Sequence, residues 1–211
     1  MSRRSDEIFG RIAHRYDFLN TVLSLGQEQK WRRRGIAHLP PGRVLDLGGG
    51  TGAANPEFKG RLVVALDPVA AMLGRNAALC RVVAVGERLP FADDTFAGVF
   101  SAFVFRNLSS IEETVAEVAR VLQPGGRLVV VDLTRPLGKG RTLLHRVGTA
   151  ITLPLAGLAA GAAGEYWYLH RSLDSLPPPE QLFSDLTLPL TTLWRMGPLG
   201  FVYGAVLTKP P

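Results

Sequence analysis

A glycine-rich turn set between two aspartates is the part of the sequence most suited to chemistry. The stretch "VLDLGGGTG" runs from Val44 to Gly52, and Asp46 stands two residues before its first glycine. Glycine lets a ligand approach the backbone closely, and a carboxylate at the end of an apolar run attracts a cationic group. Asp67 ends the next apolar run, where an acid accepts hydrogen bonds from both hydroxyls of a ribose. These residue types together predict a nucleotide-binding site.

Two kinds of nucleotide fit this turn. Gly48, Gly50 and Ala53 match the fingerprint of dinucleotide-binding folds, in which a long helix follows the turn and faces the pyrophosphate. Here the residues that follow, "AANPEFKGR", are few and include Pro56, so they suit that task poorly. Asp46 favours S-adenosylmethionine instead, because the amino-acid moiety of that molecule carries a cationic amino group. An NAD-dependent oxidoreductase is the weaker alternative.

The glycine turn must be positioned by the elements around it, and along the chain apolar runs of strand length alternate with a helical pattern. Continuous apolar runs of strand length occur at residues 43–47, 61–66, 81–85, 96–103 and 126–133. Such runs indicate a sheet covered on both faces, and their alternation with helices predicts parallel strands. Ser110 and Glu113 have capping-box spacing, which predicts an amphipathic helix that ends at the Pro-Gly-Gly of residues 124–126. The ligand is then expected beyond the carboxyl ends of the strands, beside the first one.

Three segments depart from this rhythm. Residues 4–39 show helical periodicity and predict an N-terminal helical lid over residues 1–40. Residues 136–176 predict a helical insertion over the substrate site, either a buried or lid-forming hairpin or a surface that contacts lipid; Pro154 argues against a membrane-spanning helix. The tail "LTTLWRMGPLGFVYGAVLTK" predicts two strands around a Gly-Pro-Leu-Gly turn.

Composition narrows the partners. The chain has 211 residues and a formal charge of +6, which suits one domain and a partner that is nucleic acid, an anionic membrane or an anionic substrate. The basic cluster "WRRRG" lacks the long runs typical of nucleic-acid binding, so nucleic acid is not expected. Cys80 is the only cysteine, which excludes a disulfide, fits a reducing compartment and suggests a small buried side chain. Because the N-terminus has no secretory apolar segment, a cytoplasmic location is expected.

Several stretches make the sequence resemble a known family. They include "FGRIAHRYDFLNTVLSLGQEQKWRR", "VLDLGGGTG", "LPFADDTF", "FVFRNL" and "ARVLQPGGRLVVVDLTRP". The sequence resembles the class I S-adenosylmethionine-dependent methyltransferases, and within them the family that C-methylates demethylmenaquinone and the corresponding ubiquinone precursor. The resemblance covers nearly the whole chain. It implies a single Rossmann-like α/β domain over residues 1–211, whose mostly parallel seven-stranded sheet ends in an antiparallel hairpin and is flanked by helices.

The resemblance also implies a set of residues that bind the cofactor. The methionine end would be cradled by the glycine turn, the ribose held by the next strand end, and the adenine placed by the residues after the third strand. The residues implied are Asp46, Gly48, Gly50, Thr51, Gly52, Asp67, Pro68, Val85, Gly86 and Ala102. No metal is implied.

Catalysis is expected from the residues that follow the fourth strand. Arg106 and Asn107 are expected to face the quinol, and Tyr16 would help to close the site. Arginine stays protonated at neutral pH, so Arg106 would stabilise a phenolate or order a water rather than act as a base. The candidates for the base are His14, Tyr16, Asp17 and His170, and each also has an ordinary structural role open to it.

The sequence departs from the family at two places in this site. Val85 and Gly86 stand where the family carries Asp or Asn followed by Ala, so Glu87 or backbone groups would have to hold the adenine. Losing one such hydrogen bond costs about 1 kcal/mol. The family's Phe-Gly-x-Arg-Asn stretch reads "FVFRN" here, and Val104 and Phe105 are expected to narrow the pocket.

The sequence thus predicts a methyltransferase that acts on the ring of a prenylated quinol, with S-adenosylmethionine as cofactor and a membrane surface as a peripheral partner. Two alternatives stay open beside it. One is the same chemistry on another lipophilic small molecule, and the other is a non-catalytic subunit that keeps the fold in a quinone-biosynthesis complex. A homodimer is also left open.

Overall fold

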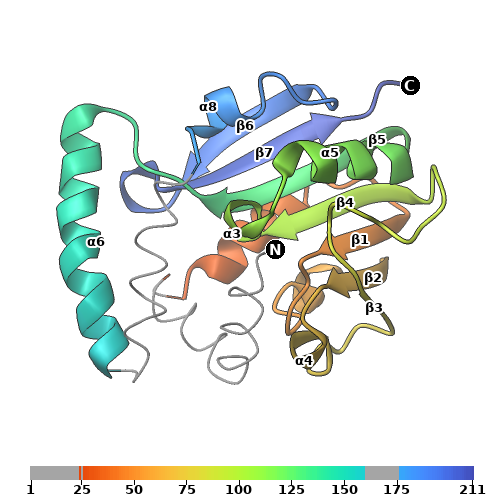
Figure 1. Ribbon diagram of the computed structural model, residues 1–211, viewed down its shortest axis with the longest axis horizontal. Helices are drawn as coiled ribbons and strands as arrows, with labels where there is room; N and C mark the ends of the chain where they lie inside the picture. The colour runs from red at the N-terminus through yellow and green to blue at the C-terminus, as the bar shows by residue number, and fades with distance from the viewer. Residues whose placement is uncertain (1–23, 25, 160–175) are drawn as a thin grey trace.

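The computed structural model describes residues 24, 26–159 and 176–211, and one sheet of seven strands forms its centre (Figure 1). The strands are β1 (Arg43–Leu47), β2 (Leu62–Asp67), β3 (Cys80–Val83), β4 (Phe96–Ala102), β5 (Leu122–Leu133), β6 (Leu190–Met196) and β7 (Val202–Thr208). The five runs predicted from the sequence are therefore strands, with bounds shifted by a few residues.

The strand order is β3-β2-β1-β4-β5-β7-β6. β1 to β5 pair in parallel, and β7 is antiparallel to both of its neighbours. The order reverses at β1, whose neighbours are β2 and β4, so a crevice opens beside the carboxyl end of β1. The predicted mostly parallel sheet and its antiparallel hairpin are confirmed.

Helices and short 3-10 turns connect the strands. They are α3 (Glu28–Ile36), η1 (Asn55–Glu57), α4 (Ala70–Leu73), η2 (Phe105–Asn107), α5 (Ile111–Val121), α6 (Lys139–Ala159), α8 (Pro179–Leu182) and η3 (Pro198–Gly200). The capping box at α5 is confirmed in part, because the Ser110 hydroxyl accepts a hydrogen bond from the Glu113 N–H at 3.1 Å.

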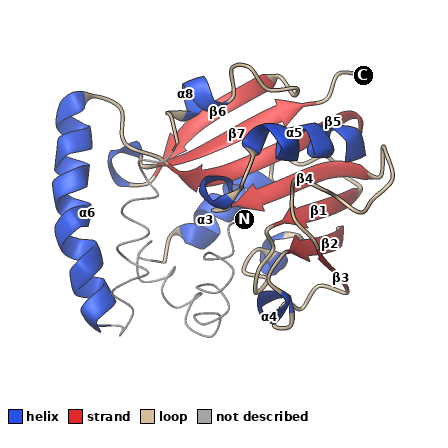
Figure 2. Cartoon of the chain, viewed as in Figure 1, coloured by secondary structure: helices blue, strands red, loops and turns tan. Residues whose placement is uncertain are grey.

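The sheet carries a buried apolar cluster on each face. One cluster joins α5 and the chain around α8 to the sheet, through Val115, Val118 and Phe183 among others. The other joins α3 to the opposite face through Trp31 and Ile36. Figure 2 shows the resulting order of layers, with α5 in front of the sheet and α3 behind it. Helices on both faces are what the continuous apolar strands predicted.

Two details differ from the sequence prediction. The helix α5 ends at Val121, and β5 begins at Leu122, because Leu122 pairs with Phe96 before the Pro-Gly-Gly turn. Cys80 is exposed rather than buried, since it opens β3 at the edge of the sheet. The prediction of a small buried cysteine was wrong.

The helix α6 lies beyond the end of β5, at the far left in Figure 1. It runs for 21 residues and continues through Pro154. It belongs to the predicted insertion, whose residues 160–175 lie outside the described part of the chain. Within the described residues, no helix is long and apolar enough to cross a membrane.

Candidate functional site

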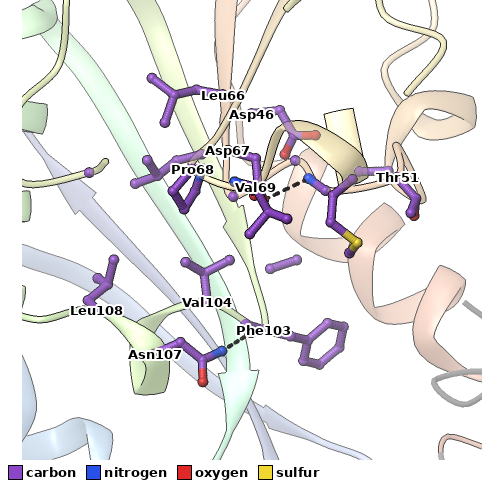
Figure 3. Close-up of a pocket in the computed structure, with 18 of the residues that line it drawn as sticks. Asp46, Thr51, Leu66, Asp67, Pro68, Val69, Phe103, Val104, Asn107 and Leu108 are labelled. Atoms are coloured by element: carbon purple, nitrogen blue, oxygen red, sulfur yellow. Dashed lines mark hydrogen bonds between the residues drawn. The ribbon is translucent and has the colours of Figure 1, made fainter. Parts of the chain in front are cut away.

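A cavity lies at the carboxyl ends of β1, β2 and β4, in the crevice where the strand order reverses. Its empty space of ≈ 870 Å³ includes space that is open to solvent. Figure 3 shows Asp46 and Asp67 above Phe103 and Asn107 in this cavity. The residues predicted from the sequence that line it are Asp46, Gly48, Gly50, Thr51, Asp67, Pro68, Val85, Gly86, Ala102 and Asn107. Gly52 and Arg106 do not line it.

The glycine turn has a backbone that requires glycine. Gly48 has a φ of +72°, and a Cβ at this position would lie 2.3 Å from Val104 Cγ2. Gly52 has a φ of +89°, and a Cβ there would lie 2.5 Å from Asn55 Nδ2. Gly52 therefore shapes the turn from outside the cavity, and Gly48 forms part of its wall.

Asn76 stabilises this turn by hydrogen bonds to its backbone. Its side-chain amide donates to the carbonyl oxygens of Gly49 at 3.3 Å and Gly50 at 3.1 Å, and its Oδ1 accepts from Asn55 Nδ2 at 2.9 Å. Asn76 is only 2% exposed. The sequence did not single out Asn76, and the only signal was a polar residue beside the apolar run of β3.

Asp46 is the residue whose surroundings most clearly call for a ligand. It is 2% exposed, and its Oδ2 has no hydrogen-bond partner among the described residues. Burial raises the pKa of Asp46 to about 7, attraction from the Arg32 guanidinium opposes that rise, and repulsion from Asp67 adds to it. A cationic group bound in the cavity would supply the missing partner. The amino group of S-adenosylmethionine is such a cation, so these residues fit the cofactor that the sequence predicts.

Asp67 links the glycine turn to the next loop. Its Oδ2 accepts from the Gly50 N–H at 3.1 Å, and its Oδ1 accepts from the Val69 N–H at 2.8 Å. Asp67 thus lies at the carboxyl end of β2, where an acid accepts hydrogen bonds from ribose hydroxyls. Pro68 lines the cavity beside it.

The far end of the cavity lacks a dedicated side-chain acceptor. Val85 is 39% exposed there, and Gly86 packs against Thr114, since a Cβ on Gly86 would lie 3.0 Å from Thr114 Cγ2. Glu87 lines this end, and its Oε1 accepts from the backbone N–H groups of Ser109 at 2.8 Å and Ser110 at 3.3 Å. Glu87 thus holds the start of α5 in addition to lining the cavity.

The wall opposite the aspartates is built by the residues after β4. Phe103 has a φ of +65°, a left-handed conformation that side chains other than glycine rarely adopt. The Asn107 amide donates to the Phe103 carbonyl oxygen at 3.4 Å and so closes the η2 turn. Val104 lines the cavity, as predicted, whereas Phe105 is buried in the core and packs against Phe183 with ring centroids 6.0 Å apart. The expectation that Phe105 narrows the pocket was wrong.

Arg106 lies behind this wall and forms a buried ion pair. Its Nη1 lies 2.6 Å from Asp132 Oδ1, with side-chain exposures of 9% and 1%. Asp132 Oδ2 also accepts from the Phe105 N–H at 2.8 Å. Asp132 therefore ties η2 to the end of β5. Asp132 was not predicted from the sequence, although a lone carboxylate in the apolar run "RLVVVDL" was a signal.

Arg32 is a further residue of the cavity wall, and it was not predicted from the sequence. It lies on α3, is 5% exposed, and lines the cavity on the side of Asp46. The sequence showed it only as part of a basic cluster, in which its neighbours Arg33 and Arg34 are exposed.

The remaining predictions concern residues outside the described part of the chain. They are His14, Tyr16, Asp17 and His170. Within the described part, no group of three or more His, Cys, Asp or Glu side chains is placed to hold a metal ion.

Known proteins of similar sequence belong to one family of methyltransferases. Residues 1–187 match the model of the ubiE/COQ5 methyltransferase family. A demethylmenaquinone methyltransferase from Thermus thermophilus is 39% identical over 191 residues, with 83% of this chain and 87% of that protein covered. Another, from Mycobacterium sp. strain KMS, is 39% identical over 214 residues, with 97% and 93% covered.

Solved structures agree in fold. A SAM-dependent methyltransferase from Thermotoga maritima superposes with a TM-score of 0.64 at 14% sequence identity, with 96% of this chain and 98% of that chain covered. At 14% sequence identity, the structural similarity supports only the fold. The family match is what supports the methyltransferase activity. The chain is an S-adenosylmethionine-dependent methyltransferase, and it belongs to the ubiE/COQ5 methyltransferase family.

Proposed function

We propose that the protein C-methylates the ring of a prenylated quinol, demethylmenaquinol or a close relative, in quinone biosynthesis. The observation that carries the proposal is the pairing of two features in one cavity. A buried carboxylate whose Oδ2 has no hydrogen-bond partner among the described residues lies at the glycine turn, and a wall made by Phe103, Val104 and Asn107 faces it. The relatives named as demethylmenaquinone methyltransferases support this choice of substrate.

The roles of the residues follow from their positions. Asp46 and the turn residues Gly48, Gly50 and Thr51 hold the methionine end, Asp67 and the backbone at Pro68 hold the ribose, and Val85, Gly86 and Ala102 enclose the rest of the cofactor. Gly52 keeps the shape of the turn. When bound, S-adenosylmethionine would supply an electrophilic methyl group: the ring carbon of an ionised hydroquinone would displace S-adenosylhomocysteine as the S–CH3 bond breaks, and that carbon would then lose its proton.

The wall after β4 positions the quinol ring. Asn107 lies at the cavity surface, and Arg106 is held behind it by Asp132. In this arrangement the Arg106–Asp132 pair keeps η2, and with it Asn107, in place. Tyr16 closes the site from the N-terminal segment. Most of the catalysis is then positioning of the ring carbon and exclusion of water.

We also propose that the segments 1–40 and 136–176 cover the substrate side and that α6 contacts the membrane surface. On α6, the side chains of Leu143, Leu144 and Val147 are 63%, 62% and 51% exposed. Arg141 and Arg146 interrupt this apolar set, and both are exposed. An apolar helical face beside cations is typical of helices that lie in the membrane interface. A lipophilic quinol would be taken up from that interface.

The proposal is tested by methyl transfer from labelled S-adenosylmethionine to reduced demethylmenaquinone in detergent or vesicles. We expect labelled menaquinone, and micromolar binding of S-adenosylmethionine and S-adenosylhomocysteine by calorimetry. Transfer to simple phenolic lipids but not to demethylmenaquinol would assign another lipophilic substrate. Binding of neither cofactor form would favour the non-catalytic subunit and overturn the proposal.

A further inference from the structure

Val104 is the residue at which the wall after β4 meets the glycine turn. It lines the cavity together with Phe103 and Asn107. A Cβ on Gly48 would lie 2.3 Å from Val104 Cγ2, 3.0 Å from its Cγ1 and 3.2 Å from its Cβ, so the isopropyl group of Val104 faces the backbone of the turn. Figure 3 shows Val104 below Pro68 and above Asn107. Val104 therefore lies where the glycine turn and the wall on the substrate side come together.

The glycine turn is held in place on its side of this contact. The N–H groups of Gly48 and Gly49 both donate to the Leu66 carbonyl oxygen, at 2.8 Å and 3.0 Å. The Gly50 N–H donates to Asp67 Oδ2 at 3.1 Å. These hydrogen bonds join three successive residues of the turn to the end of β2. The turn is thereby prevented from moving away from Val104.

The wall is held in place on the other side. The Phe103 N–H donates to the Val131 carbonyl oxygen at 2.8 Å, and the Phe105 N–H donates to Asp132 Oδ2 at 2.8 Å. Both acceptors belong to β5, so the residues before and after Val104 are tied to one strand. Valine is branched at Cβ, which restricts its χ1 angle. The space between the turn and the Val104 side chain therefore has a set width.

The reacting part of the cofactor belongs in this space. In S-adenosylmethionine the sulfur joins the methionine moiety to the ribose, and the cavity offers Asp46 to the ammonium group and Asp67 to the ribose. The group on the sulfur must point from the turn to the wall, because the acceptor ring lies on the wall side. Val104 is the wall residue whose side chain faces the turn.

We propose that Val104 determines the specificity for the transferred group, because its isopropyl group leaves room on the sulfonium for a methyl but not for a larger alkyl group. A site with fixed walls discriminates against an extra methylene, since accommodating it would require shifts of packed side chains or backbone. The inference rests on the proposed function for the positions of the methionine end and of the acceptor ring.

A packing role alone would produce the same contact. Val104 would then only hold the turn against the wall, and removing its methyl groups would weaken every ligand of the turn to the same extent. The two roles differ in how the effect depends on the ligand. Only a size-limiting role makes the effect of a substitution depend on the alkyl group carried by the sulfur.

The experiment measures calorimetric binding of three ligands to the full-length protein. S-Adenosylmethionine carries a methyl group on sulfur, S-adenosylethionine carries an ethyl group there, and S-adenosylhomocysteine carries neither. We expect the wild type to bind S-adenosylethionine roughly 10- to 200-fold more weakly than S-adenosylmethionine. Val104→Ala should bring these two affinities within about threefold of each other and leave the affinity for S-adenosylhomocysteine within about twofold of the wild type.

Two further variants serve as controls. Val104→Thr keeps the branched shape of the side chain and should keep the wild-type preference for methyl over ethyl. Val83→Ala removes the same atoms from a valine of β3 that is 59% exposed and lies outside the cavity lining, and it should also keep that preference. If Val104→Ala does not fold, Val104→Ile tests the opposite direction. Its larger side chain should weaken S-adenosylmethionine at least about fivefold relative to S-adenosylhomocysteine.

Two results would overturn the inference. One is equal affinity of the wild type for S-adenosylmethionine and S-adenosylethionine, and the other is an equal loss for all three ligands in Val104→Ala. A wild type that binds none of the ligands would overturn both this inference and the proposed function. Methyl transfer to reduced demethylmenaquinone is measured on the same samples. Binding with the expected preference but without transfer would contradict the choice of quinol alone and support the role of Val104.

Discussion

Asp46 is an acid whose surroundings oppose its own charge. Its pKa of about 7 lies well above the usual 3.8 because the carboxyl is buried, and Arg32 and Asp67 are the charged groups that act on it. A raised pKa in the folded state means that the stabilising contribution is present below about pH 4 and is lost as the pH rises to 7. Ionisation of Asp46 therefore lowers the free energy of unfolding of the cofactor-free protein at neutral pH. The same ionised carboxylate is the form that binds a cation.

Asp46→Asn should separate these two effects. Without cofactor, the variant should be more stable than the wild type near pH 8, by roughly 2–4 kcal/mol, and equal to it near pH 4. Its affinity for S-adenosylhomocysteine should fall at least about tenfold. Urea unfolding and calorimetry at both pH values measure the two quantities.

The wild type should also bind S-adenosylhomocysteine about fivefold more tightly at pH 7 than at pH 6, since the carboxyl ionises in that range. Asp46→Asn should show no such rise. Asp185→Asn removes an exposed acid and serves as the control, with wild-type stability and pH dependence. A pH-independent affinity in the wild type would contradict the assignment of Asp46.

The sequence predicted the site residues that lie within or next to the glycine turn and the strand ends. It did not predict the residues that come to the cavity from other segments of the fold. Asp46, Asp67 and the glycines are contiguous with their strands, so pattern alone located them. Arg32 and Asn76 reach the turn from other segments. No local pattern marks a side chain that a helix or a later loop brings to the site.

Among the elements, η2 depends most on a distant partner. This three-residue turn presents Asn107 to the cavity, and Asp132 at the end of β5 holds it through Arg106 and the Phe105 N–H. The carboxylate and the guanidinium are both buried. Removing one member would leave the other charge buried without its partner.

Asp132→Leu should therefore destabilise the protein by about 3–5 kcal/mol, whereas the double variant Arg106→Met with Asp132→Leu should regain most of that loss. Methyl transfer should stay low in both variants, and calorimetry should show S-adenosylhomocysteine bound by the double variant as by the wild type. Equal loss of cofactor binding and transfer in the folded double variant would refute a role on the substrate side.

The strands could be predicted because each is continuously apolar, and the exceptions have identifiable causes. The start of β5 at Leu122 results from pairing with Phe96, a contact that no property of "VLQPGG" encodes. The exposure of Cys80 follows from the short η1 and the edge position of β3; Leu62 at the start of β2 and Leu79 just before β3 are exposed as well. The residues of a strand do not by themselves predict whether that strand will lie at the edge of the sheet.

The whole molecule combines a formal charge of +6 with one exposed apolar helix face. Both features favour an anionic membrane, and the electrostatic part should weaken with salt. The sheet order and its closing hairpin were predictable from the succession of runs, but the way α6 stands beyond the sheet was not. The position of an inserted helix depends on the contacts of its own side chains. The motifs shared with the family do not specify those contacts.

We expect the protein to cosediment with vesicles that contain anionic phospholipid, and less so at high salt. Leu143→Gln, Leu144→Gln and Val147→Thr combined should reduce that binding at least about tenfold and leave calorimetric binding of S-adenosylhomocysteine unchanged. The matched control is Leu62→Gln with Leu79→Gln, since these leucines, at the start of β2 and just before β3, are more exposed than the three α6 residues. If the control abolishes vesicle binding and the α6 variant does not, α6 is not the contact surface.

The exposed position of Cys80 has a practical consequence for such measurements. The chain contains one cysteine, and that thiol is accessible at the edge strand rather than in the cofactor cavity. A maleimide dye or spin label would therefore attach at a single known position in the unmodified sequence, without any cysteine having to be removed. The native protein can serve as its own fluorescent or paramagnetic reporter, provided that it is kept reduced so that two copies do not join through this thiol.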